Sequence, residues 1–90
     1  MNTIPISRIT IAPDRQRQDF DPKAQGELNE SIQTHGLISP VVLRKDGEGY
    51  ALVAGERRLR AVTMLGILGQ SFTHAGESVP AGHIHYIDFG

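Results

Sequence analysis

The apolar residues of this chain recur at two spacings, one typical of helices and one of strands. Ala24, Leu28 and Ile32 are four positions apart, which predicts a helix over about 22–35 with one buried face. Asp21-Pro22 before this stretch is typical of a helix start, and Gly36 after it of a helix end. The stretch is therefore expected to be one complete amphipathic helix.

A second apolar repeat lies further along the chain and predicts a second helix, from about Glu56 to Leu65, ending near Gly66 or Gly69. This helix would bury the apolar positions of its sequence: Leu59, Ala61, Val62 and Leu65. Short apolar stretches predict the strands: one or two between residues 4 and 11, then 41–44, 50–54 and 83–88.

The connections between these elements are polar. Residues 45–49 have the composition of a turn, so 41–44 and 50–54 should form a hairpin, and Pro5 favours a strand at the edge of a sheet. Residues 69–82 are polar and contain glycine, which predicts a long loop. We expect an α+β fold, a small mixed sheet packed by two main helices, with residues 1–90 as a single domain.

Composition narrows the class of function. The 90 residues carry a net charge of −1 and contain no cysteine, which excludes disulfides and a thiol nucleophile. No signal peptide and no apolar run of membrane-spanning length are evident, so a cytoplasmic protein without a membrane partner is expected. Six of the nine basic residues lie in two clusters, which favours a compact anion site over a broad duplex-binding face: Arg15, Arg17, Lys23, Arg57, Arg58 and Arg60.

The stretch Gly55–Ala61 is the strongest candidate site. It follows a predicted strand and starts a predicted helix, where free backbone N–H groups and the helix dipole attract anions. Arginines there can bind phosphate oxygens in a bidentate manner. We therefore expect a phosphate site, and the alternative is a solvated, ion-paired helix start in which Glu56 only complements the dipole.

Other candidate stretches have simpler explanations. Residues 36–40 could line a ligand pocket or serve only as a helix end and a strand start, and the loop 15–18 could be solvated. The four histidines do not supply the three or four converging ligands of a metal site, so surface or half-buried packing is expected. No G-x-S-x-G pattern is present, so a hydrolase triad is not supported.

Taken together, these stretches resemble a known family. Gly55-Glu56-Arg57-Arg58-Leu59-Arg60-Ala61 with the preceding 50–54 looks like the signature box of the ParB N-terminal domain, of the ParB/sulfiredoxin superfamily. Residues 4–9 resemble its opening strand, Arg17 with Phe20-Asp21 its entry to the first helix, and residues 28–40 its first box. The resemblance covers about residues 4–66 and the last strand.

The resemblance implies a nucleotide-binding switch domain of a plasmid or chromosome partition protein. Such domains bind CTP, or another nucleoside triphosphate, with Mg²⁺, and close as a homodimeric clamp on DNA. Glu56 would hold the metal and is the candidate catalytic group. The nucleotide-binding residues implied for this chain, including Arg60 of the signature box, are Arg17, Gly36, Leu37, Ser39, Pro40, Gly55, Glu56, Arg57, Arg58 and Arg60.

The chain also departs from the family pattern. A cysteine stands at the Glu56 position in sulfiredoxins, so sulfiredoxin activity is excluded. Ser39 stands where the family commonly has glutamine, which leaves the identity of the nucleotide base open. Arg15-Gln16 stands where the family usually has Gln-Pro. Residues 69–82 form a longer stretch than the family's usual short link to the next strand. The family's helix-turn-helix domain is expected to be absent from this chain, since it would follow Gly90.

Two other functions stay open at this point. One is a ParB-like nuclease or phosphoryl-transfer enzyme that uses the same phosphate site, and weak nucleoside triphosphatase activity belongs to this alternative. The other is a protein-interaction module whose arginines are only surface charge. The sequence does not decide whether hydrolysis or DNA cleavage occurs, which DNA site is recognised, or how this fragment self-associates.

Overall fold

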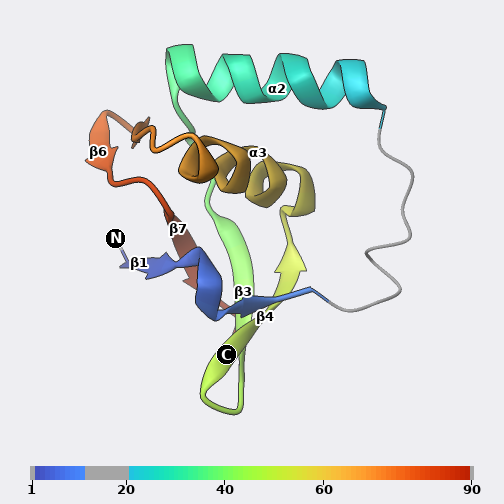
Figure 1. The fold of residues 1–90 in the computed structure, drawn as a ribbon. Helices are drawn as coiled ribbons and strands as arrows, with labels where there is room; N and C mark the ends of the chain where they lie inside the picture. The colour runs from blue at the N-terminus through green and yellow to red at the C-terminus, as the bar shows by residue number, and fades with distance from the viewer. Residues whose placement is uncertain (1, 12–20, 90) are drawn as a thin grey trace.

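The chain folds around one mixed sheet with two helices on one side of it (Figure 1). The structure, a computed structural model, describes residues 2–11 and 21–89. The sheet has the strand order β1-β7-β3-β4-β2. Its strands are β1 (Asn2–Pro5), β2 (Ile9–Thr10), β3 (Val41–Asp46), β4 (Gly49–Ala54) and β7 (His83–Asp88).

The first helix, α2, covers Pro22–His35 and has the predicted ends. The Asp21 side chain accepts a hydrogen bond from the Lys23 N–H, and Pro22 occupies the first turn, where its missing N–H costs nothing. Gly36 ends the helix with a φ of 81°, a conformation that glycine adopts without strain. Ile32 is fully buried while Leu28 is half-buried against the core, so the predicted apolar face is confirmed.

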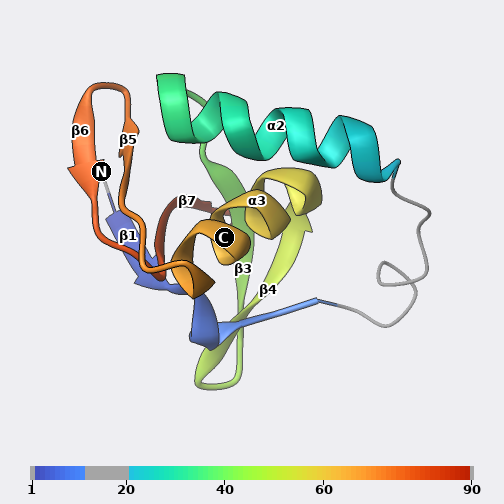
Figure 2. The ribbon, with the colours of Figure 1, turned by 45° about the horizontal axis from the view of Figure 1, so that its top comes forward.

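The second helix, α3, covers Glu56–Ile67 and lies between α2 and the sheet (Figures 1 and 2). It is two residues longer than the sequence pattern suggested, and Gly69, with a φ of 71°, follows its end. Its inner face is completely buried: Leu59, Ala61, Val62 and Leu65. These residues pack on Val41, Leu43 and Ile84 of the sheet to form the core.

The sheet connections place the start of α3 beside the start of β3. β3 and β4 form the predicted antiparallel hairpin, while β3 runs parallel to β7 and β4 runs parallel to β2. β1, which contains Pro5, is an edge strand paired to β7, as predicted. A short 3-10 helix, η1 (Ile6–Arg8), joins β1 to β2. The expected α+β architecture is thus confirmed.

Residues 69–82 differ from the prediction of a long loop. They contain a second sheet, an antiparallel hairpin of β5 (Phe72–His74) and β6 (Glu77–Val79), drawn in orange in Figure 2. Phe72, His74 and Val79 are buried, so burial of a few side chains organises a stretch whose composition is otherwise polar. The loop prediction was therefore wrong.

Candidate functional site

The start of α3 forms one wall of a cavity of about 660 Å³. This volume falls within the range of small-molecule sites, roughly 300–1,000 Å³. Gly55, Glu56, Arg57 and Arg58, four of the candidate residues of the signature stretch, line the cavity. Three further lining residues were not singled out from the sequence, because their apolar or small side chains carry no chemical signal: Leu28, Val53 and Ala54.

Gly55 is the residue that turns strand β4 into helix α3. Its φ of 99° belongs to the left-handed region, where a side chain would be strained. A Cβ built on Gly55 would also lie 2.8 Å from Cγ1 of Val41, so β3 leaves no room for one. The glycine therefore brings the backbone of the turn close to β3, and this contact fixes where α3 begins.

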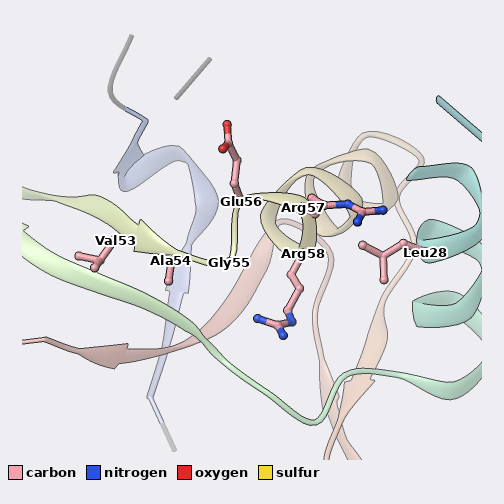
Figure 3. A pocket seen from close by; sticks show the side chains of 7 residues that line it. All are labelled: Leu28, Val53, Ala54, Gly55, Glu56, Arg57 and Arg58. Atoms are coloured by element: carbon pink, nitrogen blue, oxygen red, sulfur yellow. The ribbon is translucent and has the colours of Figure 1, made fainter. Parts of the chain in front are cut away.

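The three charged residues of the first turn extend in different directions (Figure 3). Arg57 extends toward α2, where Leu28 lies, and Arg58 extends on another side of the helix. Arg57 is exposed and Arg58 half-buried, so both guanidinium groups remain accessible from the cavity that they line. The geometry suits a polyanion held at the helix start, because the free N–H groups, the helix dipole and two guanidinium groups that line the same cavity all attract negative charge.

Glu56 is unusual because its carboxylate is buried and has no partner among the described residues. The residue is only 7% exposed, and within the part of the chain that the structure describes neither carboxylate oxygen accepts a hydrogen bond. In Figure 3 its side chain leads away from Arg57 and Arg58. A buried carboxylate is costly unless a donor or a cation satisfies it, so this position fits a bound cation better than a purely structural role.

Magnesium is compatible with a single carboxylate. The ion is usually held in proteins by one or two carboxylates together with phosphate oxygens and water. Among residues 2–11 and 21–89, no cluster of three or more metal-ligating side chains occurs, so a site built from protein ligands alone is not indicated there. Glu56 could hold the ion only together with a ligand that supplies further oxygens.

The other candidate residues lie elsewhere. Arg60 lines a separate, largely apolar cavity beside η1 and β2, not the one at the helix start. Gly36, Leu37, Ser39 and Pro40 form the connector between α2 and β3, which reaches the site through Val41, the residue packed against Gly55. Arg17 lies outside the described residues, so its placement stays a prediction.

Comparisons with known proteins bear directly on this geometry. The family described as the ParB N-terminal domain matches residues 1–71. The chromosome-partitioning protein ParB of Myxococcus xanthus is 44% identical over 64 residues, and stage 0 sporulation protein J of Bacillus subtilis is 42% identical over 64 residues. Each match covers 71% of this chain but only 22% and 23% of the relatives, so the chain spans less than a quarter of their length.

Solved structures share the fold. A truncated ParB of Caulobacter crescentus complexed to the centromeric parS site has a TM-score of 0.68 and 27% identity, covering all of this chain and 42% of that one. The same protein complexed with CTP-gamma-S gives 0.71 at 24% identity, with 97% and 42% covered. Sulfiredoxin from Arabidopsis thaliana gives 0.69 at 23% identity, with 97% and 81% covered.

Proposed function

The chain belongs to the ParB N-terminal domain family, and from that premise we propose that it is a nucleotide-binding switch domain of a partition-type DNA-binding protein. The observation that carries the proposal is the cavity at the start of α3, which Gly55, Arg57 and Arg58 line. A triphosphate is the ligand that matches this arrangement, because its charge suits both the helix start and the guanidinium groups.

CTP is the nucleotide proposed first. A domain with the same fold is found in the Caulobacter crescentus protein complexed with CTP-gamma-S, which motivates the choice of base. In this chain the phosphates would lie over residues 55–58, and the connector with Gly36, Leu37, Ser39 and Pro40 would line the nucleoside side of the site. Arg17 and Arg60 are further proposed contacts, which the bound state would have to bring to the ligand.

Mg²⁺ is proposed as the second component. Glu56 would hold the ion or its water shell, since its buried carboxylate has no other partner among the described residues. The ion would neutralise phosphate charge when bound, and Arg57 and Arg58 would orient the remaining phosphate oxygens.

The partners of the longer protein follow from the same premise. The Caulobacter crescentus relative is complexed to the centromeric parS site, so we infer a DNA partner for the protein that contains this domain, with contacts mainly outside these residues. Self-association as a homodimer is part of the proposal. Among the described residues no helix has the length and apolar character needed to cross a bilayer.

Titration calorimetry with CTP, ATP and GTP, each with and without magnesium, tests the proposal. We expect magnesium-dependent binding of CTP that Arg57→Ala and Arg58→Ala weaken at least tenfold, as expected for loss of a charge-assisted bidentate contact worth about 1.5–3 kcal/mol. Arg44→Ala is the matched control, because Arg44 is exposed on β3 and does not line the cavity. Absence of binding to all three nucleotides would contradict the proposal.

One observation favours an enzymatic alternative at the same site. A buried, unpartnered carboxylate beside a phosphate site can also serve as the metal-binding group of a nuclease or phosphoryl-transfer enzyme. That function predicts magnesium-dependent nicking of supercoiled plasmid, or nucleotide hydrolysis, that Glu56→Gln abolishes. Nicking or hydrolysis that persists in this variant would rule out Glu56 as the catalytic group.

A further inference from the structure

Two histidines stack on each other where the β5–β6 hairpin meets the main sheet. The imidazole rings of His74 in β5 and His85 in β7 lie with centroids 4.5 Å apart and planes only 7° from parallel. His74 is fully buried and His85 is 4% exposed. The sequence analysis expected surface or half-buried packing for the histidines, and for these two that expectation was wrong.

The stacked rings have little to stabilise a positive charge. Among the described residues, no hydrogen bond of normal geometry reaches either ring nitrogen of His74 or Nδ1 of His85, and a weaker approach of the Ile38 backbone favours a protonated His74. Burial, and then the neighbouring His85, lower the pKa of His74 below its ordinary value, while the Ile38 backbone and Glu77 oppose this shift. We therefore expect the His74 ring to be neutral in the folded state near neutral pH.

The titratable and polar groups that face the pair come from the elements packed against it. Glu77 of β6, exposed to solvent, stands opposite His74 in the hairpin register. β1 places Thr3, which does not titrate, opposite His85. α2 also packs against β5 and ends at His35, an exposed residue. Among the described residues, the negative charge that acts on His74 is thus a solvated one, which compensates little for burial.

A metal-binding role for the pair does not fit this geometry. Nearly parallel stacked rings direct their nitrogen lone pairs into parallel planes, so the two rings cannot converge on one ion. No third ligating side chain joins them among the described residues. The pair is better understood as a buried stack that depends on His74 carrying no proton.

The hairpin that carries His74 holds the connector between α2 and β3. The Leu37 N–H donates to the Thr73 carbonyl, and the Ala75 N–H donates to the Leu37 carbonyl, both at 2.8 Å. These two bonds lie on either side of His74. Gly36 approaches Thr73 so closely that an added Cβ would lie 2.2 Å from Oγ1. The connector is thus fixed by the strand in which His74 is buried.

The connector in turn reaches the proposed nucleotide site. It ends at Val41, which packs against Gly55 at the start of α3. Loosening of the hairpin would therefore free residues 36–40 on one side of the site while leaving the β3–β4 pairing intact. The family match ends at residue 71, so this hairpin lies outside the part of the chain that the family describes.

We propose that His74 and His85 form a proton-sensitive latch, in which the stack with a neutral His74 holds the β5–β6 hairpin against the connector and protonation of His74 releases it. One consequence of this release would be weaker nucleotide binding on acidification, and that consequence rests on the proposed function. The release itself does not depend on any ligand.

Native-state hydrogen exchange of the Leu37 and Ala75 amides tests the latch directly. Their protection factors, normalised to unstructured peptide at the same pH, should fall about tenfold between about pH 7.5 and pH 5.5, as expected when an imidazole of ordinary pKa 6.5 is freed to bind a proton. The opening should be local, so at pH 5.5 both amides should be less protected than the Leu59 amide, which bonds to Gly55. Equal protection of all three amides would overturn the proposal.

Phenylalanine variants separate protonation from packing. His74→Phe keeps an aromatic ring at the stacked position and cannot be protonated, so the pH dependence should disappear. His85→Phe keeps the buried His74, so most of the pH dependence should remain. The matched control is His35→Gln, which removes an exposed histidine and should keep the tenfold change. If His74→Phe does not fold, the NMR titration of the wild-type His74 ring decides: a ring protonated at pH 6.5 or above overturns the latch, and one that stays neutral there supports it.

Measurement of CTP binding at both pH values distinguishes failure of the latch from failure of the proposed function. CTP affinity should fall from about pH 7.5 to pH 5.5 more steeply in the wild-type chain than in His74→Phe, a comparison that cancels the titration of the nucleotide's own phosphate near pH 6. No CTP binding at either pH, together with pH-dependent exchange, would refute the proposed function and leave the latch standing. CTP binding without pH-dependent exchange would refute the latch alone.

Discussion

The side-chain nitrogen of Gln25 in α2 donates a hydrogen bond of 3.1 Å to the main-chain oxygen of Arg57 in α3. The same nitrogen lies 3.0 Å from the Asn29 side-chain oxygen, so Gln25 joins its own helix to the first turn of the next. That turn carries the residues proposed to bind phosphate. A side chain outside the signature stretch therefore fixes its position relative to α2.

Replacing Gln25 should weaken this junction. Gln25→Leu keeps a good helix former but removes the donor, and should lower the free energy of unfolding by about 1 kcal/mol, the typical contribution of one such bond. Urea denaturation monitored by circular dichroism measures this change in the free energy of unfolding. The control is Gln33→Leu, at an exposed position of α2. Equal stability of the Gln25 variant and the wild-type chain would show that the bond contributes nothing.

Two glycines should respond in opposite directions to alanine. Gly55→Ala forces a Cβ to within 2.8 Å of Val41 at a φ of 99°, and should destabilise the fold by about 1–3 kcal/mol. Gly26→Ala adds a methyl group with nothing within 4 Å in the middle of α2, and should stabilise it by about 0.5–1 kcal/mol. Thermal and urea unfolding of both variants check the pair. A stable Gly55→Ala variant would contradict the close approach of the turn to β3.

Glu56 should show opposite effects on stability and on ligand binding. Glu56→Gln removes a buried carboxylate that has no partner among the described residues, so without magnesium the free energy of unfolding should rise, by about 1 kcal/mol. The same change should abolish the contribution of magnesium to nucleotide affinity. Glu30→Gln, an exposed change in α2, controls for net charge. Retained magnesium dependence in Glu56→Gln would place the ion elsewhere.

The stability of the chain should fall on acidification because of His74. Its pKa is lowered in the folded state, so between that value and the ordinary 6.5 the unfolded chain binds more protons. Stability from the neutral ring is fully present above pH 6.5 and is lost as pH falls below it, by at most about 1.4 kcal/mol at pH 5.5. Urea unfolding of the wild-type chain and His74→Phe at both pH values isolates this contribution. Parallel losses in both proteins would assign the pH dependence to other groups.

The elements predicted correctly are those with a local cause. α2 has an Asp cap, a proline and a terminal glycine within its own sequence, and the buried face of α3 follows from its repeat. The cavity-lining residues Gly55–Arg58 were also singled out from the sequence, because a glycine and charges at a helix start have chemical meaning. Gln25 was not, since its role depends on where α3 packs.

The β5–β6 hairpin was missed for a different reason, and its turn provides the last prediction. Ala75 and Gly76 form the two-residue turn with φ values of 51° and 84°, a conformation usually signalled by Asn-Gly. Alanine is strained there, while asparagine and glycine tolerate a positive φ. Ala75→Asn should therefore stabilise the hairpin by about 0.5–1 kcal/mol.

Hydrogen exchange provides the measurement for this turn. The Leu37 amide, which bonds to Thr73 in β5, should become more protected in Ala75→Asn, whereas the Leu59 amide in α3 should be affected less. Ala81→Asn, in the turn that precedes β7, is the matched control, since Ala81 does not have a positive φ. If Ala75→Asn lowered the protection of Leu37, the left-handed turn would be wrong, and the hairpin would need another register.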